Sequence, residues 1–254
     1  MCVAALAIDQ HPRFRWVLAH NRDEYLDRPA QPMSLWQGSG ILAGKDLRGG
    51  GTWLGARTGG AWALVTNVRA PGVPREGKRS RGELVTRFLE SGRDPADYLA
   101  EVESGLVQYG GFTLVCGRLG GGADVLRAGK REHWDPGFHS LSNGTSGGAP
   151  WPKCRRLEAG LGRLLAQAEG EFPWERGFEL LSDSTQAPDG ELPQTGVPLE
   201  TERALSSVRV QLPGYGTRCS TLGVWDAQAG DWLWAERSYG LNRITDNSYW
   251  ALTH

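Results

Sequence analysis

The pattern that decides the fold lies in MCVAALAIDQHPRFRWVLAHNRDE, residues 1–24. Residues 2–8 and 14–20 are apolar runs of strand length, and the polar segment between them contains Pro12. Two neighbouring runs of this kind predict an antiparallel hairpin at the start of the chain. In such a hairpin the polar residues after the second run would lie close to Cys2.

Cys2 follows the initiator methionine directly. A residue this small normally lets methionine aminopeptidase remove Met1, which would leave a thiol and a free α-amine on one residue. The reference pKa of an α-amine is about 7.7–8.0, so part of it is neutral at physiological pH and can accept the thiol proton. The alternative interpretation is a small apolar residue that opens a buried strand.

A dense polar cluster ends the second apolar run, in the order His20, Asn21, Arg22, Asp23 and Glu24. Such groups need partners if they are buried. A carboxylate at this place could hold the ammonium form of the terminal amine or accept its hydrogen bonds. The alternative is an ion pair of Asp23 with a nearby arginine around a turn.

A glycine-rich segment, AGKDLRGGGTWLG, covers residues 43–55. It matches neither GxxxxGK[ST] nor GxGxxG, and a strand rather than a helix is expected after it, which argues against a phosphate-binding loop. We expect a tight turn where the backbone approaches another backbone or a ligand.

Strand and helix patterns alternate in blocks along the rest of the chain. A capping box of Ser80 and Glu83 predicts one helix start, and Asp94-Pro95 predicts a second helix that ends near Gly105. Further strands are expected at 53–56, 61–67, 112–116, 124–127, 139–141, 218–226 and 231–239, further helices at 153–168 and 174–182, and a polar loop at 188–198. This order favours an antiparallel α+β architecture of packed layers over a doubly wound sheet.

The bulk properties narrow the possible partners and compartments. The net charge of -1 gives no basic field for a nucleic acid or an anionic membrane. Residues 2–8 are too short for a secretory or membrane segment, so we expect a cytoplasmic protein without a membrane span. The 4 cysteines form no CxxC pair, which argues against zinc, any other metal site and a disulfide framework. The length of 254 residues leaves the number of domains open.

Ordered motif blocks run along nearly the whole chain, and they resemble those of the NRDE family of proteins like transport and Golgi organisation protein two. The blocks are Met1-Cys2, Asn21-Arg22-Asp23-Glu24, Arg28-Pro29, Ala43-Gly44 with Asp46, Gly50-Gly51-Thr52-Trp53-Leu54-Gly55, Thr66-Asn67-Val68-Arg69, Ser80-Arg81-Gly82, Gly111-Phe112, Leu141-Ser142-Asn143, Pro150-Trp151-Pro152-Lys153, Leu192-Pro193 with Thr195-Gly196, and Tyr215-Gly216-Thr217-Arg218.

That family in turn resembles the cysteine branch of the N-terminal nucleophile hydrolases. The resemblance implies a four-layer αββα sandwich of antiparallel sheets, with residues 1–254 as a single domain. It implies that Cys2 is the nucleophile, that Asp23 holds its α-amine, and that Asn67 and Asn143 lie near the oxyanion. Arg218 would complete the polar network near the thiol. Further binding residues are expected to be Asn21, Arg22, Glu24, Thr52 and Trp53.

One position departs from the hydrolase pattern. Those enzymes usually have arginine where this chain has His20, and Arg22 would then supply the charge. Guanidinium groups of Arg22 and Arg218 near Cys2 lead us to expect a thiol pKa below its ordinary value.

The resemblance therefore implies a hydrolase that cleaves a non-peptide acyl amide through Cys2 and requires no cofactor. The alternative is a non-catalytic protein that carries haem, or an acyl-CoA or lipid ligand, in the same pocket. His20 would then be a candidate axial ligand to the haem iron. No feature of the sequence positively indicates a protein-interaction module.

Overall fold

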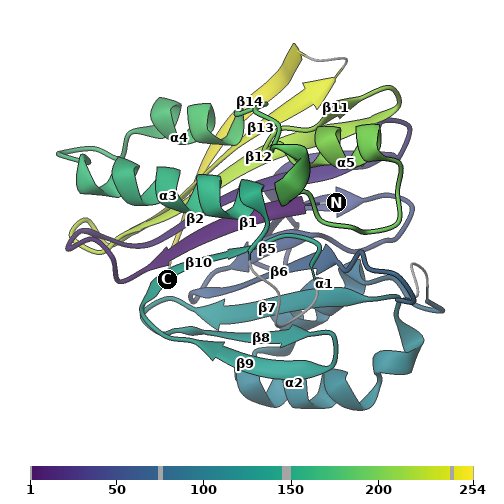
Figure 1. The fold of residues 1–254 in the computed structure, drawn as a ribbon. Helices are drawn as coiled ribbons and strands as arrows, with labels where there is room; N and C mark the ends of the chain where they lie inside the picture. Colours follow the sequence, from purple (N-terminus) through teal and green to yellow (C-terminus); the bar gives the residue numbers. More distant parts are fainter. Residues whose placement is uncertain (1, 74–76, 145–149, 241–242, 254) are drawn as a thin grey trace.

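The two apolar runs at the start of the chain form the predicted hairpin (Figure 1). Strand β1 (Cys2–Ile8) pairs antiparallel with β2 (Phe14–Tyr25), and Cys2 lies opposite Arg22. Every residue of β1 is buried, because β10 (Gly137–Leu141) pairs with its other side. This computed structural model describes residues 2–73, 77–144, 150–240 and 243–253.

The hairpin belongs to a 7-stranded antiparallel sheet that joins the two ends of the chain. Its main order is β10-β1-β2-β12-β13-β14. The remaining strands are β11 (Gln211–Leu212), which pairs with β12, then β12 (Tyr215–Asp226), β13 (Asp231–Gly240) and β14 (Arg243–Leu252). We call it the hairpin sheet.

The second 7-stranded sheet is a meander, in which each strand pairs with the next along the chain. We call it the meander sheet. It consists of β3 (Ala30–Leu35), β4 (Ile41–Asp46), β5 (Leu54–Arg57), β6 (Ala61–Asn67), β7 (Phe112–Arg118), β8 (Ala123–Arg127) and β9 (Lys130–Trp134).

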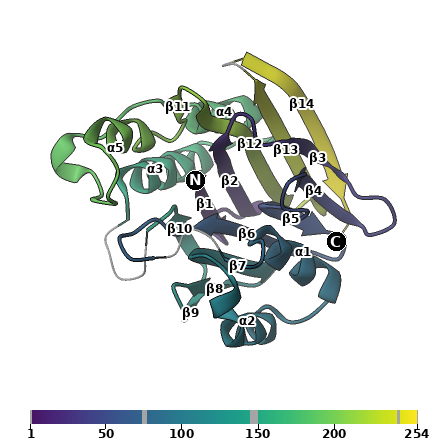
Figure 2. The same ribbon diagram turned by 90° about the vertical axis from the view of Figure 1, so that its right-hand side faces the viewer.

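Helices cover the outer face of each sheet, as Figure 1 and the turned view in Figure 2 show. Apolar side chains of α3 (Pro152–Ala166) and α4 (Trp174–Leu181) pack on the hairpin sheet. Those of α1 (Gly82–Ser91) and α2 (Pro95–Ser104) pack on the meander sheet. The remaining helical segments are η1 (Leu106–Gln108), η2 (Asp189–Glu191) and α5 (Leu199–Leu205). The predicted α+β sandwich of four layers, αββα, is confirmed.

A cluster of tryptophans fills the space between the two sheets. The ring centroid of Trp16 lies 5.1 Å from that of Trp62 and 5.5 Å from that of Trp234, and Trp232 packs against both Trp16 and Trp234. All four are fully buried. These indoles pack on one another and stabilise the core.

The glycine-rich segment forms the predicted tight turn between β4 and β5. The Gly50 N–H donates to the Asp46 carbonyl at 2.8 Å, and Gly50 has a φ of 76°. A Cβ on Gly51 would lie 2.3 Å from the carbonyl carbon of Gly82, at the start of α1. The backbone of the turn therefore packs directly on another backbone, as expected for this segment.

The predicted capping box at Ser80 and Glu83 is wrong. Helix α1 begins at Gly82 with Arg81 as its N-cap and has no side-chain cap. The Glu83 carboxylate instead accepts a hydrogen bond from the Tyr109 hydroxyl at 2.6 Å and pairs with Arg79. The predicted start of α2 is confirmed, since Asp94 accepts the Ala96 N–H at 2.9 Å.

Within the described residues, no helix is both long enough and apolar enough to cross a membrane.

The shared inter-sheet core leads us to predict that the chain folds as one domain. Both sheets contribute to the tryptophan cluster, so neither would bury its inner face alone. Limited proteolysis should give no pair of separately stable halves, and thermal unfolding followed by tryptophan fluorescence and by circular dichroism should coincide in one transition. Two resolved transitions would contradict a single domain.

The contact of Gly51 with Gly82 gives a second prediction. Gly51→Ala should lower the free energy of unfolding by about 1–3 kcal/mol, because the added methyl group must displace the backbone at the start of α1. Urea unfolding measures this change. Gly50→Asn is the matched control, since nothing lies within 4 Å of a Cβ there and asparagine tolerates a positive φ. Equal losses in the two variants would contradict the packing argument.

Candidate functional site

The register of the hairpin sheet brings Cys2 to the polar end of β2. Cys2 lies opposite Arg22 on one side, and Cys219 of β12 lies opposite Arg22 on the other. Since directly opposed residues share a face of a sheet, all three side chains point between the two sheets. Asp23 is the next residue of β2 after Arg22.

A polar cavity of about 320 Å³ lies beside Cys2, and we call it the thiol cavity. Cys2 itself is 7% exposed. Asp46 and residues 77–82 form part of the wall of this cavity. Most of the predicted site residues also line it, namely Cys2, Arg22, Asp23, Glu24, Thr52, Trp53 and Asn67. The prediction that these residues gather in one place therefore agrees with the fold, while their roles stay predictions.

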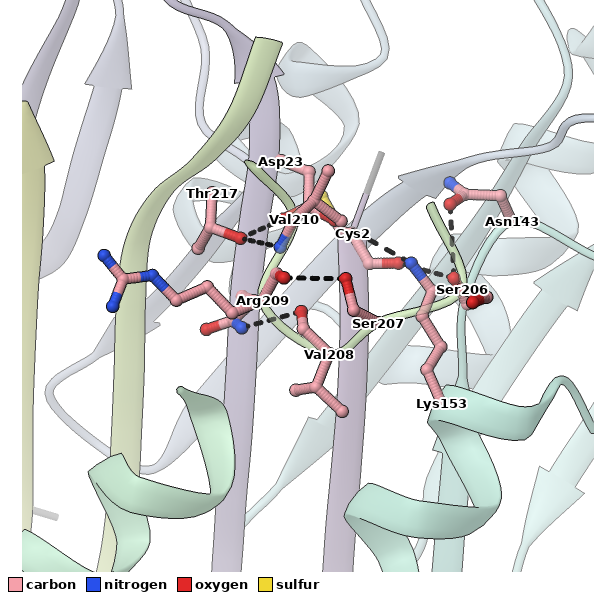
Figure 3. A network of polar contacts seen from close by, with 12 residues as sticks. Cys2, Asp23, Asn143, Lys153, Ser206, Ser207, Val208, Arg209, Val210 and Thr217 are labelled. Atoms are coloured by element: carbon pink, nitrogen blue, oxygen red, sulfur yellow. Dashed lines mark hydrogen bonds and ion pairs between the residues drawn. The ribbon is translucent and has the colours of Figure 1, made fainter. Parts of the chain in front are cut away.

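The Asp23 carboxylate is buried between β12 and α3 (Figure 3). Its Oδ1 accepts a hydrogen bond from the Thr217 hydroxyl at 2.7 Å, and its Oδ2 lies 3.8 Å from the Nζ of Lys153. Burial raises the pKa of Asp23, and the Lys153 charge opposes that shift. Lys153 was not among the predicted site residues, although Pro152-Lys153 stood in one of the motif blocks.

A chain of hydrogen bonds joins Cys2 to Asn143 and Asn67. The Ser142 hydroxyl lies 2.7 Å from the carbonyl oxygen of Cys2 and 3.2 Å from the Oδ1 of Asn143. The Nδ2 of Asn143 donates to the Asn67 carbonyl at 2.7 Å. Asn143 thus fixes the end of β6, while Asn67 lies on the cavity wall. Ser142 is a second residue that sequence reasoning missed.

Arg22 closes the cavity on the side of the meander sheet. Its guanidinium lies over the Trp53 ring at 4.1 Å from the centroid, and its NH2 lies 3.3 Å from the Oδ2 of Asp46. The Nε of Arg28 donates to the same oxygen at 2.7 Å. Although burial alone would raise the pKa of Asp46, the Arg28 and Gly49 hydrogen bonds and the guanidinium charges lower it. Asp46 therefore stays ionised and holds both arginines.

Besides Asn143, three other predicted site residues do not line the thiol cavity. Asn21 points toward the helices, where its Nδ2 donates to the carbonyls of Leu181 and Val208 at 2.8 and 3.0 Å. Arg218 occupies a bulge of β12, so its guanidinium turns away and donates to the carbonyls at positions 25, 26 and 28. His20 is 0% exposed between the sheets, and burial lowers its pKa to about 3.

The expectation of a lowered thiol pKa is wrong. Burial raises the pKa of Cys2 in the chain that retains Met1, and the Asp23 charge adds to this shift. The charge of the terminal amine, the Asp23 N–H and the Arg22 charge offset it only in part. Burial also raises the pKa of Cys154 to about 11, and it raises the pKa values of Cys116 and Cys219 well above the ordinary thiol value. All four cysteines are free thiols.

A second, more apolar cavity of about 330 Å³ adjoins the first, and we call it the side chamber. Glu24, Asn67 and Arg81 belong to the walls of both cavities. The apolar wall of the side chamber is formed by Tyr25, Val68, Val197, Leu205, Leu212 and Tyr215. Among the described residues, no group of three or more His, Cys, Asp and Glu side chains could hold a metal ion.

The chain is similar to two solved structures. It is similar to a Caenorhabditis elegans N-acylethanolamine-hydrolyzing acid amidase ortholog, with a TM-score of 0.49, 12% identity and coverage of 88% of this chain and 92% of that one. It is also similar to a variant of conjugated bile acid hydrolase from Clostridium perfringens, with a TM-score of 0.47, 9% identity and coverage of 100% and 97%.

Two curated proteins match over nearly their whole length. The Transport and Golgi organization protein 2 homolog of Bos taurus is 35% identical over 264 residues, which cover 94% of this chain and 93% of that protein. The Homo sapiens homolog is 33% identical with the same coverage. The family described as Transport and Golgi organisation 2 matches residues 1–240. The chain therefore belongs to the Transport and Golgi organisation 2 family.

Proposed function

We propose that this protein is a cysteine amidohydrolase that uses Cys2 as its nucleophile and acts on a non-peptide acyl amide. The observation that carries the proposal is the position of Cys2 at the start of β1, on the wall of the thiol cavity. Removal of Met1 would give this residue a free α-amine beside the Asp23 carboxylate. Nucleophile and base would then belong to one residue.

The reaction would proceed in two stages. In the first, the Cys2 sulfur attacks the amide carbonyl carbon while the thiol proton passes to the α-amine. The tetrahedral intermediate then collapses, the C–N bond breaks, and the proton moves from the ammonium group to the departing amine. In the second stage, water attacks the thioester with the α-amine as base, and the free acid and the thiol are released.

The raised pKa of Cys2 supports the need for this base. A buried thiol is protonated at neutral pH, so a group beside it has to accept the proton as the sulfur attacks. An α-amine in its neutral form has a suitable reference pKa of about 7.7–8.0.

The two adjoining cavities support a small amide as the substrate. Their volumes are typical of pockets for small molecules rather than of clefts that hold a folded polypeptide. With the carbonyl near Asn67, which belongs to both walls, one substituent of the amide would enter the polar thiol cavity and the other the apolar side chamber. The substrate would therefore have one polar and one apolar part.

Carriage of a ligand without a reaction is the second candidate, and the apolar wall of the side chamber favours it. The names of the curated relatives describe transport, and an acyl-CoA or lipid chain would suit this wall. His20 is not placed to ligate a haem iron in either cavity, because it lines neither of them and is fully buried between the sheets. The two candidates differ in whether Cys2 is needed.

Cys2 should be the most reactive of the four cysteines in protein from which Met1 has been removed. Burial raises the pKa of all four thiols, but Cys2 lines the thiol cavity and would have the α-amine as its base. Limited iodoacetamide treatment at neutral pH followed by peptide mapping ranks them, and Asp23→Asn should slow the labelling of Cys2.

The same variants separate the two candidate functions. Cys2→Ala should abolish hydrolysis of a panel of N-acyl amides, while Cys219→Ser, the matched control, should keep it. Earlier labelling of Cys154 or Cys219, or an unchanged Cys2 rate in Asp23→Asn, would remove the nucleophile assignment. Carriage would be favoured if the wild-type protein hydrolysed no amide in the panel and bound acyl-CoA or lipid with the same affinity as the Cys2→Ala variant.

Asn67 provides a test of oxyanion stabilisation. Loss of one oxyanion donor costs roughly 3–4 kcal/mol, so Asn67→Ala should lower kcat by about 10²–10³-fold with little change in KM. Steady-state kinetics on a hydrolysed amide measures both values. Asn247→Ala, at an exposed position of β14, is the control. A rise in KM with an unchanged kcat would instead assign Asn67 to ground-state binding.

A further inference from the structure

Lys153 is a buried lysine that the reaction described above does not use. Burial lowers the pKa of its ammonium group, and the Asp23 charge opposes that shift. Lys153 lies in the first turn of α3, and its side chain is 1% exposed. Its Nζ lies 3.8 Å from the Oδ2 of Asp23. The Nζ has no hydrogen-bond partner among the described residues. Burying an ammonium group is costly unless an opposite charge compensates it. The position of Lys153 therefore depends on the Asp23 carboxylate.

The direction of the side chain follows from the helix packing. Helix α3 lies on β1 and β2, and its first turn approaches the end of the hairpin that holds Cys2 and Asp23. Figure 3 shows Lys153 extending from α3 toward these two residues. The amine thus reaches the polar cluster from the helix side, opposite the thiol cavity.

The Asp23 carboxylate has more cations around it than it can neutralise. Its Oδ1 accepts from Thr217, its Oδ2 faces Lys153, and the α-amine of Cys2 would join them after removal of Met1. One negative charge can balance either the lysine ammonium or an α-ammonium, but not both. Two unscreened positive charges in a buried cluster repel each other strongly.

We propose that Lys153 is a positioning residue that takes up the charge of Asp23 and thereby keeps the α-amine of Cys2 neutral, the form that can accept the thiol proton. This inference rests on the proposed function, because it assigns the α-amine as the base. Asp23 then holds the amine through hydrogen bonds rather than as an ion pair.

The neighbouring charges also favour a neutral α-amine. Arg22 and Arg69 add positive charge near the cluster, although each also has a carboxylate partner, Asp46 and Glu202 respectively. A further positive charge on the α-amine would therefore be unfavourable. The titratable groups coupled to Cys2, Asp23 or Lys153 include the chain's terminal amine and six side chains, those of Arg22, Glu24, Arg69, Cys154, Tyr215 and Cys219.

The sign of the effect follows from this charge count. With the lysine present, the α-ammonium is disfavoured, so the amine becomes neutral at a lower pH. When the lysine charge is removed, Asp23 can stabilise the α-ammonium, and the α-amine pKa should rise by about one unit or more. The acid limb of kcat/KM should move to higher pH by the same amount.

The test measures the α-amine directly in protein whose loss of Met1 has been verified by intact mass. The rate of acetic anhydride acylation of the α-amine, followed by mass spectrometry across pH, gives its pKa. Lys153→Met and Lys153→Gln should raise that pKa by about one unit or more. Lys130→Met, which removes an exposed lysine on β9, is the matched control and should leave it unchanged.

Wild-type protein provides a measurement that does not depend on a folded variant. Its α-amine pKa should lie below that of the free peptide CVAALAI, residues 2–8, under the same conditions. A value at or above that of the peptide would overturn the inference, as would an unchanged pKa in a folded Lys153→Met or Lys153→Gln. A shifted pKa in a protein that hydrolyses no amide would contradict the proposed function and leave the electrostatic role of Lys153 intact.

Discussion

The position of the whole site depends on one constraint, the burial of β1 at every residue between two partner strands. A strand that is buried on both faces has to be paired along its length, so its register cannot slip without exposing apolar residues or leaving backbone groups unpaired. That register places Cys2 opposite Arg22 and next to Asp23. It also brings the end of β10 beside the start of β1, where Ser142 hydrogen-bonds to Cys2. The apolar sequence of seven residues thus fixes the place of the polar ones.

The polar groups at the end of this strand are costly, and the structure pairs them across layers. The Lys153 and Asp23 pair joins a helix to the hairpin sheet, and the Arg22 and Asp46 pair joins that sheet to the meander sheet. Replacing such pairs by apolar side chains is often neutral or stabilising, so their presence is weak evidence for a role in stability. Groups with shifted pKa values cluster at functional sites, and both pairs lie beside one thiol.

The sequence was informative for several local properties, although the local prediction of a capping box at Ser80 and Glu83 was wrong. The hairpin, the Asp94 cap and the tight turn at Gly50 and Gly51 follow from neighbouring residues, and they are confirmed. Edge strands such as β9, with the sequence KREHW, escaped prediction because an edge exposed to water needs no apolar alternation. The partners of Asp23 come from α3 and β12, far along the chain, so only the tertiary fold identifies Lys153 and Thr217 as its neighbours. The orientation of Arg218 depends on a single extra residue in β12, which no periodicity reports.

The burial of β1 also sets an order of events in synthesis. An aminopeptidase needs an accessible chain end, and Cys2 becomes inaccessible once β1 is enclosed by its neighbours. The partners of the first hairpin lie at residues 137–141 and 215–226, so the sheet cannot close until most of the chain has left the ribosome. Synthesis at about 5–20 residues per second leaves an interval of about ten seconds or more in which the end stays open. Under the proposed function, slow closure of this non-local sheet would separate the removal of Met1 from folding in time.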